Sequence, residues 1–411
     1  MREGFFRAVS TAEFTKLLRT FAPLPAETVA LDAVRGRFLA GDVFAGENLP
    51  PAGRAAMDGY AVRAAEAFGA TENSPSYLDL AMDIPIGVIP DQPLPPGRCA
   101  RIVTGAFLPE GADAVVMVEY TEDLGAGAIE IRRPVAPGEN MLFAGEDAAM
   151  GQCILAAGTK LRPQEIGMLA ALGQTTVAVG RRPSVAVLST GDELVPASAT
   201  PRPGQIRDVN THTLSAMVAA AGAEAHAFPL VPDDLPGITA ALADAAAAHD
   251  LTLLSGGSSV GARDFTLDAL RGLGADILAH GVAISPGKPT ILANLAGRPV
   301  IGLPGQVTSA QVVMAVFGAP LLAHLAGDVA AFDRPVRTFP AILSRNVASK
   351  QGREDHVRVR LEQRPGQLPL AHPVLGKSGL LKTLLLADGL IVIPADLEGY
   401  AGGREVAVRP I

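Results

Sequence analysis

A serine- and glycine-rich turn at residues 255–264 has the composition of an anion-binding site. It reads Ser-Gly-Gly-Ser-Ser-Val-Gly-Ala-Arg-Asp and joins an apolar run at 251–254 to a helical pattern that begins near residue 265. A strand, a glycine-rich turn and a helix in this order present free backbone N–H groups to an anion such as phosphate. Ordinary strand-to-helix turns have a similar composition, so this stretch alone leaves both interpretations open.

Three further polar turns follow apolar segments, and the first two of them carry candidate carboxylates. They are Ser-Thr-Gly-Asp-Glu-Leu at 189–194, Pro-Asp-Asp at 232–234 and Leu-Pro-Gly at 303–305. Carboxylate oxygens are typical ligands of Mg²⁺, although Asp234 could instead cap the helix that follows it. Ligands of open α/β sheets bind outside the carboxyl ends of the strands. Four polar turns at one sheet edge therefore predict a site for an anionic ligand.

The elements that position these turns alternate between strand and helix from residue 182 onward. The expected strands and extended segments lie at 185–188, 224–230, 251–254, 277–284 and 299–303. The expected helices lie at 210–221, 235–249, 265–273 and from about 307 onward. This alternation predicts a doubly wound, mostly parallel sheet with helices on both faces. We expect Asn210 or Thr211 to cap the first of these helices.

Short strands separated by proline and glycine predict small β domains on both sides of this α/β region. The first set lies between residues 60 and 147, and strands return at 341–343, 356–361, 389–394 and 404–408. Helical spacing of apolar residues occurs at 11–20, and Pro163 suits the first turn of a helix at 163–172. The sequence thus predicts an α/β multidomain protein.

Composition narrows the function classes. The 411 residues carry a formal net charge of −8, so no overall basic character points to nucleic acid. The two cysteines form no Cys-x-x-Cys motif, which argues against a zinc site and a disulfide framework. The first ten residues lack the apolar core of a signal peptide. Polar residues and Pro320 interrupt the apolar stretch at 307–326, which we expect to be a buried helix rather than a membrane span. We therefore expect a cytoplasmic protein.

Eight motifs occur together in one order along the chain. They are Ala-Met-Asp-Gly-Tyr-Ala-Val at 56–62, the segment at 101–119 that begins Arg-Ile-Val-Thr-Gly, Gly-Glu-Asp at 145–147, the turn at 189–194, Gly-Gln-Ile-Arg-Asp-Val-Asn at 204–210, the turn at 255–264, Pro-Gly-Lys-Pro at 286–289 and Gly-Leu-Pro-Gly at 302–305. In these motifs the chain resembles the molybdopterin molybdenumtransferases, a family related to the C-terminal domain of gephyrin. The resemblance extends from about residue 14 to the C-terminus.

The resemblance implies four domains and a homodimer. An elongated α+β linker and dimerisation domain would comprise 9–47 with 148–178, and a small β domain 48–147. An α/β molybdopterin-binding domain would comprise 179–330, and a C-terminal β-barrel-like domain 331–411. The active site would be shared between subunits, with the α/β domain of one facing the small β domain of the other. Candidate protein partners are a molybdopterin adenylyltransferase and molybdoenzyme chaperones.

The resemblance also implies the final step of molybdenum cofactor synthesis. Adenylylated molybdopterin binds, molybdate is inserted into its dithiolene and AMP leaves, with help from Mg²⁺ or another divalent cation. The implied cation ligands are Glu193, Asp233 and Asp264. The implied catalytic set contains these three together with Asp58, Thr104, Asp147 and Lys288. The implied substrate-binding residues are Gly256, Gly257, Ser258, Ser259, Pro304, Gly305, Ser309, Arg353 and Ser378.

Departures from the family pattern leave two alternative functions open. Ser285 stands where the family usually has the first lysine of Lys-Pro-Gly-Lys, and Gln306-Val307 replaces Asn-Pro. One positive charge of the anion pocket is therefore missing, and Arg263 could replace it. A diverged paralogue that carries pterin nucleotide or cofactor without insertion is the first alternative, and a nucleotide pyrophosphatase is the second. The motifs at 56–62 and 101–105, which lie outside the α/β region, favour the transferase.

Overall fold

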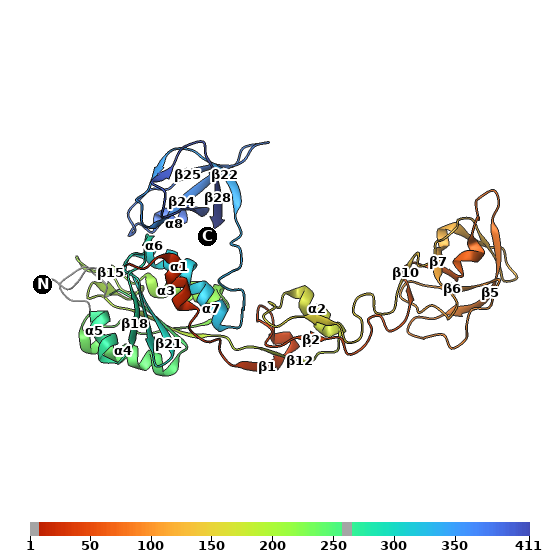
Figure 1. Cartoon of the computed structure of the whole chain (residues 1–411), viewed down its shortest axis with the longest axis horizontal. Coiled ribbons are helices and arrows are strands. Elements are labelled where there is room, and N and C mark those ends of the chain that lie inside the picture. Colours follow the sequence, from red (N-terminus) through yellow and green to blue (C-terminus); the bar gives the residue numbers. More distant parts are fainter. Residues whose placement is uncertain (1–7, 257–264) are drawn as a thin grey trace. The chain divides into compact units, whose positions relative to one another are not determined.

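The computed structural model describes residues 8–256 and 265–411, which form two compact units. The larger unit contains the described residues up to Thr28, Gly36–Ala40 and Ala178–Ile411. The smaller unit contains Val29–Arg35 and Gly41–Val177. The chain passes between the units within the strands β1 (Ala26–Ala30) and β12 (Thr176–Gly180), which are labelled in Figure 1, and again at both ends of Gly36–Ala40.

Six described strands form a mostly parallel sheet in the larger unit, in the order β16-β13-β17-β21-β20-β18. They are β13 (Ser184–Ser189), β16 (Glu224–Ala227), β17 (Leu251–Ser255), β18 (Asp276–His280), β20 (Ile291–Leu295) and β21 (Arg298–Leu303). The first four in the sheet order run parallel, whereas β20 and β18 pair antiparallel. The expected mostly parallel sheet is confirmed, and its parallel strands end at one edge.

Strand β20 is the element of this sheet that the sequence pattern does not reveal. Leu295 pairs with Arg298, so Ala296 and Gly297 alone form the hairpin loop between β20 and β21. Both loop residues have positive φ, 53° and 86°, as a type I′ turn requires. Asn-Gly and Asp-Gly are the usual sequences of such turns. Because alanine rarely adopts positive φ, the hairpin has no recognisable signature in the sequence.

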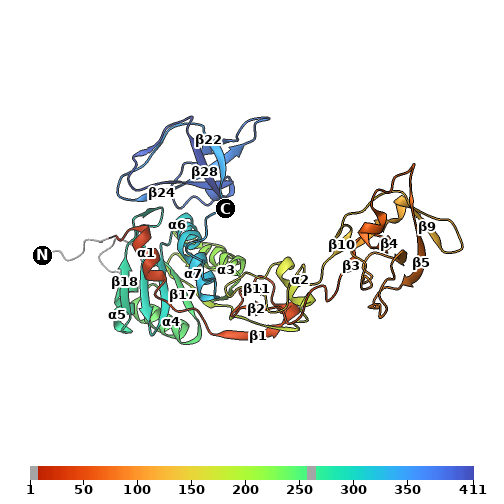
Figure 2. The ribbon, with the colours of Figure 1, turned by 45° about the vertical axis from the view of Figure 1, so that its right-hand side comes forward.

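Helices cover both faces of the sheet, as the alternation predicts. One face carries α1 (Thr11–Leu18), α3 (Asn210–Ala220), α6 (Val307–Val313) and α7 (Ala319–Leu325), and the other carries α4 (Leu235–Ala248) and α5 (Phe265–Gly272). Figures 1 and 2 show the two groups of helices on opposite sides of the sheet. Two short strands, β14 (Leu194–Val195) and β15 (Ile206–Arg207), pair with each other between β13 and α3 in the sequence.

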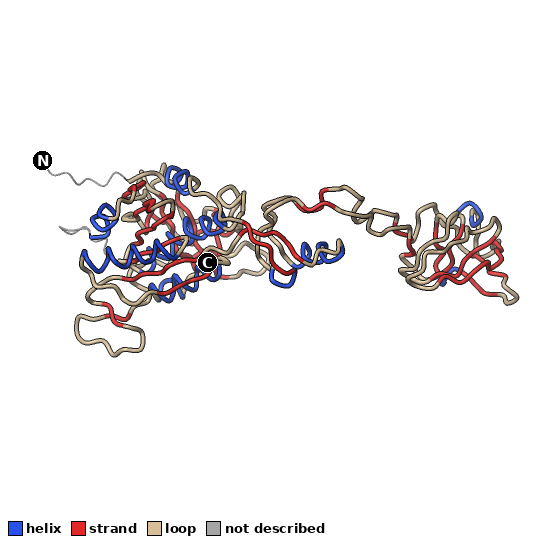
Figure 3. Tube along the Cα trace, turned by 90° about the horizontal axis from the view of Figure 1, so that it is seen from below, coloured by secondary structure: helices blue, strands red, loops and turns tan. Residues whose placement is uncertain are grey.

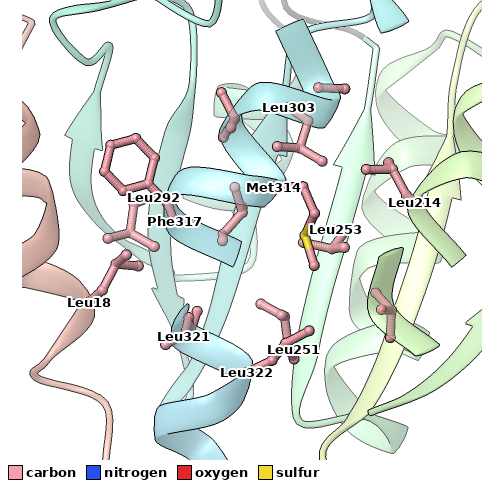
Figure 4. Packing of buried hydrophobic residues seen from close by; sticks show 14 of the residues in the cluster. Leu18, Leu214, Leu251, Leu253, Leu292, Leu303, Met314, Phe317, Leu321 and Leu322 are labelled. Carbon is pink, nitrogen blue, oxygen red and sulfur yellow. The ribbon is translucent and has the colours of Figure 1, made fainter. Parts of the chain in front are cut away.

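The apolar stretch that follows β21 is a core helix. Among the described residues, Val307–Leu325 is the one helix long and apolar enough to cross a membrane. Its side chains Met314, Phe317 and Leu321 are at most 1% exposed. Figure 4 shows Met314 beside Leu253 of the sheet and Phe317 beside Leu292. The expectation of a buried helix is confirmed, and a π-helical segment, Met314–Gly318, separates α6 from α7.

The C-terminal part of the larger unit is a closed β barrel. Its elements are β22 (Phe339–Leu343), β23 (Val347–Ala348), β24 (Glu354–Glu362), β25 (Leu370–Pro373), α8 (Lys382–Leu385), β26 (Gly389–Ile393), β27 (Gly399–Tyr400) and β28 (Glu405–Pro410). The order β24-β25-β22-β28-β26 closes because β26 also pairs with β24. The short strand β19 (Ile284–Ser285), which precedes β20, pairs parallel with β24. The barrel is therefore attached to the α/β part by backbone hydrogen bonds.

The regular elements of the smaller unit are mainly strands, which Figure 3 draws in red. Its largest sheet has the order β7-β4-β6-β5-β9-β8. These strands are β4 (Gly59–Val62), β5 (Ser76–Ile84), β6 (Arg98–Ile102), β7 (Ala114–Met117), β8 (Thr121–Asp123) and β9 (Ala128–Ile131). The remaining elements are β2 (Val43–Phe44), β3 (Arg54–Ala55), β10 (Met141–Leu142), β11 (Cys153–Leu155) and α2 (Pro163–Ala171). Buried residues cover both faces of the sheet, which gives this unit its own core.

We predict that Phe317→Ala lowers the free energy of unfolding of the larger unit by about 3–5 kcal/mol, because it leaves a cavity at a fully buried aromatic side chain. Phe317 is 1% exposed and packs against Phe14 with ring centroids 4.6 Å apart. The measurement is urea unfolding followed by circular dichroism, which suits a chain without tryptophan. Leu385→Ala, at a side chain that is 81% exposed, is the control. Similar losses in both variants would contradict the packing described here.

Candidate functional site

The backbone at the carboxyl ends of β13, β17 and β21 is closely packed. The Thr190 N–H donates to the Ser255 carbonyl (2.9 Å), and the Gly256 N–H donates to the Leu303 carbonyl (3.3 Å). Gly256 has a φ of +105°, and a Cβ at this position would clash with the carbonyl oxygen of Thr190. Only glycine fits there. The described residues at the ends of these three strands therefore lie side by side.

Asn210, the first residue of α3, connects two of these turns. Its Nδ2 donates to the Ser255 Oγ (2.6 Å) and to the Gly305 carbonyl (2.9 Å). Asn210 is 7% exposed, and its Oδ1 has no hydrogen-bond partner among the described residues. Leaving a buried acceptor without a donor costs roughly 1–3 kcal/mol. This oxygen is therefore suited to accept a hydrogen bond from a ligand.

The expectation that Asn210 or Thr211 caps α3 is wrong. The Asp208 carboxylate accepts a hydrogen bond from the Thr211 N–H (3.2 Å), so the cap interaction comes from an earlier residue. The Thr211 hydroxyl instead lies 2.8 Å from the Ser189 hydroxyl at the end of β13. The polar side chains at the start of α3 are thus used to connect the helix to the sheet edge.

Two of the expected cation ligands lie in adjacent loops at this edge. The Thr190 hydroxyl donates to Asp233 Oδ1 (3.2 Å), and the loops are also joined by a parallel bridge between Thr190 and Val231. The Glu193 carboxylate folds back against Gly191, where an added Cβ would lie 2.9 Å from Glu193 Oε2. Asp234 has the capping role that the sequence left open, because its Oδ1 accepts from the Gly237 N–H (2.7 Å). Asp233 therefore remains the carboxylate of this pair that faces Thr190.

The third expected ligand, Asp264, lies outside the described residues, as do Gly257, Ser258, Ser259 and Arg263. Within the described ranges, no group of three His, Cys, Asp or Glu side chains is placed to hold a metal ion. Glu193 is exposed and Asp233 is half-buried, so both offer oxygen atoms of the kind that Mg²⁺ binds. These two carboxylates are the part of the expected cation site that the structure describes.

The loop after β19 brings Lys288 to the junction with the barrel. Ile284 and Ser285 pair with Glu354 and Asp355 of β24. Gly287 has a φ of +126°, and an added Cβ would lie 2.6 Å from the Val313 Cγ2. The loop is therefore pressed against α6 at a position that excludes a side chain, and the exposed Lys288 follows directly.

Arg353, an expected substrate-binding residue, forms an ion pair at this junction. Its Nε lies 3.1 Å from Asp355 Oδ1. Burial by itself raises the pKa of the Asp355 carboxyl, but the hydroxyls of Ser349 and Ser285 and the Arg353 guanidinium outweigh it, so the pKa lies below its ordinary value. Asp355 is therefore ionised at neutral pH and offsets the charge of Arg353. The Ser285 hydroxyl is a hydrogen-bond donor to this carboxylate.

Ser309 and Ser378 lie in segments that contact each other. The Thr308 N–H donates to the Ser378 carbonyl (3.1 Å), and Ser309 follows Thr308 at the start of α6. Both Thr308 and Ser309 are buried, and so is Pro304 in the preceding turn. The structure thus brings together the segments of Ser309 in the α/β part and Ser378 in the barrel, both of which are expected to bind substrate.

Asp58 and Thr104 meet in the smaller unit. The Thr104 N–H and the Thr104 hydroxyl both donate to Asp58 Oδ1, each at 2.7 Å. These two hydrogen bonds, the backbone one first, lower the pKa of the Asp58 carboxyl. Asp147 is exposed in the same unit, and its N–H donates to the Leu49 carbonyl (2.9 Å). Asp58 is therefore held as an oriented carboxylate.

Comparison with known proteins covers nearly the whole chain. Three family models match it: "MoeA N-terminal region (domain I and II)" at 9–173, "Probable molybdopterin binding domain" at 186–324 and "MoeA C-terminal region (domain IV)" at 340–411. Molybdopterin molybdenumtransferase 2 of Mycobacterium tuberculosis is 37% identical over 398 residues, which is 96% of each chain. This chain belongs to the molybdopterin molybdenumtransferase family. The resemblance drawn from the sequence motifs is thus confirmed.

Other members of the molybdenumtransferase family are similar over comparable lengths. The molybdopterin molybdenumtransferase of Bacillus subtilis is 34% identical over 391 residues, 93% of this chain and 89% of the relative. A crystal structure of the molybdopterin biosynthesis protein MoeA from Pyrococcus horikoshii has a TM-score of 0.84 and 31% identity, and the match covers 98% of this chain and 100% of that chain. The expected α/β multidomain fold is confirmed by this similarity.

Two buried polar residues that contact the candidate site segments were not assigned from the sequence. Asn210 ends the motif at 204–210, but its position at a helix start suggested only a cap. Arg358 lies in the alternating pattern of β24, where its burial follows from contacts with α6 and α8 that are distant in the sequence. An internal arginine between valines in a barrel strand is the signal that could have identified it.

We predict that Thr104→Val raises the pKa of Asp58 toward its ordinary value, because the variant loses the hydroxyl donor to the carboxylate. A lowered pKa means that the bonds stabilise the fold above the ordinary aspartate pKa. That stabilisation is lost as the pH falls through the lowered value. The measurement is a ¹³C NMR titration of the aspartate carboxyl groups.

Thr121→Val is the matched control, because its hydroxyl donates to the Val118 carbonyl in the same unit and touches no carboxylate in the described hydrogen bonds. Asp58 should titrate in this control as in the unmodified chain. An unchanged Asp58 pKa in Thr104→Val would contradict the assigned hydrogen bond.

Proposed function

We propose that this chain inserts molybdate into adenylylated molybdopterin, releases AMP and yields molybdenum cofactor. The observation that carries the proposal is the convergence at one sheet edge of the ends of β13, β17 and β21 with the loops that carry Glu193 and Asp233, next to the junction with the barrel. Both substrates are anions, so the site needs N–H donors and cations rather than a negative surface. A bound polyphosphate also needs a counter-charge where its phosphoanhydride is cleaved.

The pterin nucleotide is assigned to the packed turns after β17 and β21. Gly256 and Gly305 allow a phosphate group to approach the backbone closely, and the proposal extends this surface to Gly257, Ser258 and Ser259. Pro304 keeps the start of the second turn rigid. The unpartnered Asn210 Oδ1 is placed to accept an N–H or O–H of the same ligand.

Glu193, Asp233 and Asp264 are proposed to hold Mg²⁺ or another divalent cation. When bound, the cation supplies positive charge to the phosphate oxygens of the nucleotide. The protein's own part is to fix the two described carboxylates in adjacent loops, Asp233 through the Thr190 hydroxyl and Glu193 against Gly191.

Molybdate is proposed to bind where the α/β part meets the barrel. Lys288 supplies a point charge, Ser309 and Ser378 supply hydroxyl donors, and Arg353 supplies a guanidinium. The Arg353–Asp355 pair lowers the net charge of this pocket. We therefore expect molybdate to bind more weakly here than in relatives that keep a lysine at the position of Ser285.

The active site is further proposed to be shared between the subunits of a homodimer. Asp58, Thr104 and Asp147 would then act from the smaller unit of the other copy. Exposed apolar side chains near these residues, Met57 at 42% and Phe143 at 54% exposure, support a surface that a second copy covers.

The proposed domains are 9–47 with 148–178, 48–147, 179–330 and 331–411. We place the dimer in the cytoplasm, with a molybdopterin adenylyltransferase and molybdoenzyme chaperones as candidate partners.

We predict that molybdate stimulates AMP release from adenylylated molybdopterin in the presence of Mg²⁺, with cofactor formed in parallel. AMP is measured by chromatography, and cofactor by reconstitution of a molybdoenzyme. Asp233→Asn should lower the molybdate-dependent rate at least about 10-fold, the scale of loss at groups that orient a metal. Asp244→Asn, at an exposed carboxylate on α4, should leave the rate unchanged.

The same assay separates the alternative functions. Tight binding of the nucleotide without AMP release would indicate a carrier. A rate of nucleotide release that does not depend on molybdate, and that is similar for many nucleotide substrates, would indicate a pyrophosphatase. Either result would reject the insertion activity.

We predict that mixing two inactive variants, Asp58→Asn and Asp233→Asn, restores activity if the site is shared between copies. A mixed dimer then contains one site in which both carboxylates are present, which amounts to about a quarter of all sites after random exchange of subunits. The measurement is molybdate-dependent AMP release after the subunits have been unfolded and refolded together. No recovery, or a monomer in analytical ultracentrifugation, would contradict the shared site.

A further inference from the structure

Arg358 is a buried cation at the junction of the α/β part and the barrel. It lies in β24 and is 8% exposed. Its Nη1 donates to the Thr383 hydroxyl (2.7 Å) and the Thr308 hydroxyl (3.3 Å), and its Nη2 donates to the Gly376 carbonyl (3.0 Å). One guanidinium therefore connects the start of α6, the start of α8 and the loop between β25 and α8.

These three contacts surround the segments that carry Ser309 and Ser378. Thr308 precedes Ser309, and its N–H donates to the Ser378 carbonyl. Gly376 lies two residues before Ser378, and an added Cβ at Gly376 would lie 2.9 Å from the Thr383 Cγ2. The loop at 376–383 is thus closely packed, and the guanidinium connects it to α6.

The positive charge of Arg358 has no carboxylate partner among the described residues, in contrast to the charge of Arg353. None of the described carboxylates forms an ion pair with Arg358, and burial lowers the pKa of its guanidinium. Arg353, by contrast, is paired with the ionised Asp355. A buried positive charge whose partners are only neutral oxygens favours an anion nearby.

We infer that Arg358 is the positioning residue of the molybdate pocket. It holds the Ser378 loop against the start of α6 and provides there the positive charge that Ser285 does not. This inference rests on the proposed assignment of Ser309 and Ser378 to molybdate. The inference adds Arg358 to the residues of the molybdate pocket. Arg358 contacts the start of α6 and the Ser378 loop, and it acts by holding these two segments together.

The test compares two buried arginines that connect the barrel to the same helix. Arg409 donates to the Ala315 carbonyl (2.9 Å) in the middle of Val307–Leu325, and burial also lowers the pKa of its guanidinium. Arg358→Met should raise the Kd of molybdate, measured by isothermal titration calorimetry on the full chain, at least about 10-fold. Arg409→Met should leave this Kd within about twofold while lowering the melting temperature in a similar way.

Two further measurements distinguish positioning from general loosening of the barrel. The Kd of adenylylated molybdopterin should be unchanged in Arg358→Met, because the packed turns after β17 and β21 do not contain Arg358. Arg358→Lys keeps the charge and loses the forked donors, so its Kd for molybdate should lie between those of the unmodified chain and Arg358→Met. If Arg358→Met does not fold, Thr383→Val removes one acceptor of the guanidinium and should raise the Kd at least about twofold.

The outcomes separate this inference from the proposed insertion activity. An unmodified chain that binds molybdate without inserting it would reject the activity, while a weaker Kd in Arg358→Met alone would still support the role of Arg358. Equal losses in the Arg358 and Arg409 variants would overturn the inference. An unchanged Kd in Arg358→Met, or no molybdate binding by the unmodified chain, would also overturn it.

Discussion

The close approach of β13, β17 and β21 at their carboxyl ends is the constraint on which the site depends. The Thr190 carbonyl leaves no room for a side chain at residue 256, and Asn210 uses its amide to join Ser255 to Gly305. This packing is possible because the strands are parallel and fully buried, with helices on both faces. The polar turns can then be aligned by the sheet itself, and the loops with Glu193 and Asp233 begin from the same edge.

The second constraint is the junction between the α/β part and the barrel. Strand β19 pairs with β24, and this pairing places Ser285 beside Asp355. The carboxylate is then satisfied by hydroxyls and by Arg353, whereas Arg358 five residues later has only neutral partners. Arg353, which directly precedes β24, and Arg358 within this strand thus have different electrostatic surroundings. In our account Arg353 contacts the ligand, whereas Arg358 holds the Ser378 loop against the start of α6.

The strands and turns that depend on neighbouring residues could be predicted from the sequence. The strands at 185–188, 251–254 and 299–303 are continuous apolar runs, and the turns that follow them carry glycine or acidic residues at fixed spacing. Sequence reasoning failed where structure depends on an atypical or distant partner. The hairpin before β21 uses Ala296 at positive φ, so it has no turn signature. The roles of Asn210 and Arg358 depend on Gly305 and on Thr308 and Thr383, which the sequence separates by 95, 50 and 25 residues.

The most direct test of this account is to locate the oxyanion. Tungstate has the charge and tetrahedral shape of molybdate and scatters X-rays anomalously, so crystals grown with tungstate and adenylylated molybdopterin reveal its position. We expect the strongest anomalous peak within hydrogen-bonding distance of Ser309 and Ser378, with Arg353 and Lys288 beside it. A peak in the smaller unit alone, or none at the junction with the barrel, would contradict the central claim that this junction binds the metal oxyanion.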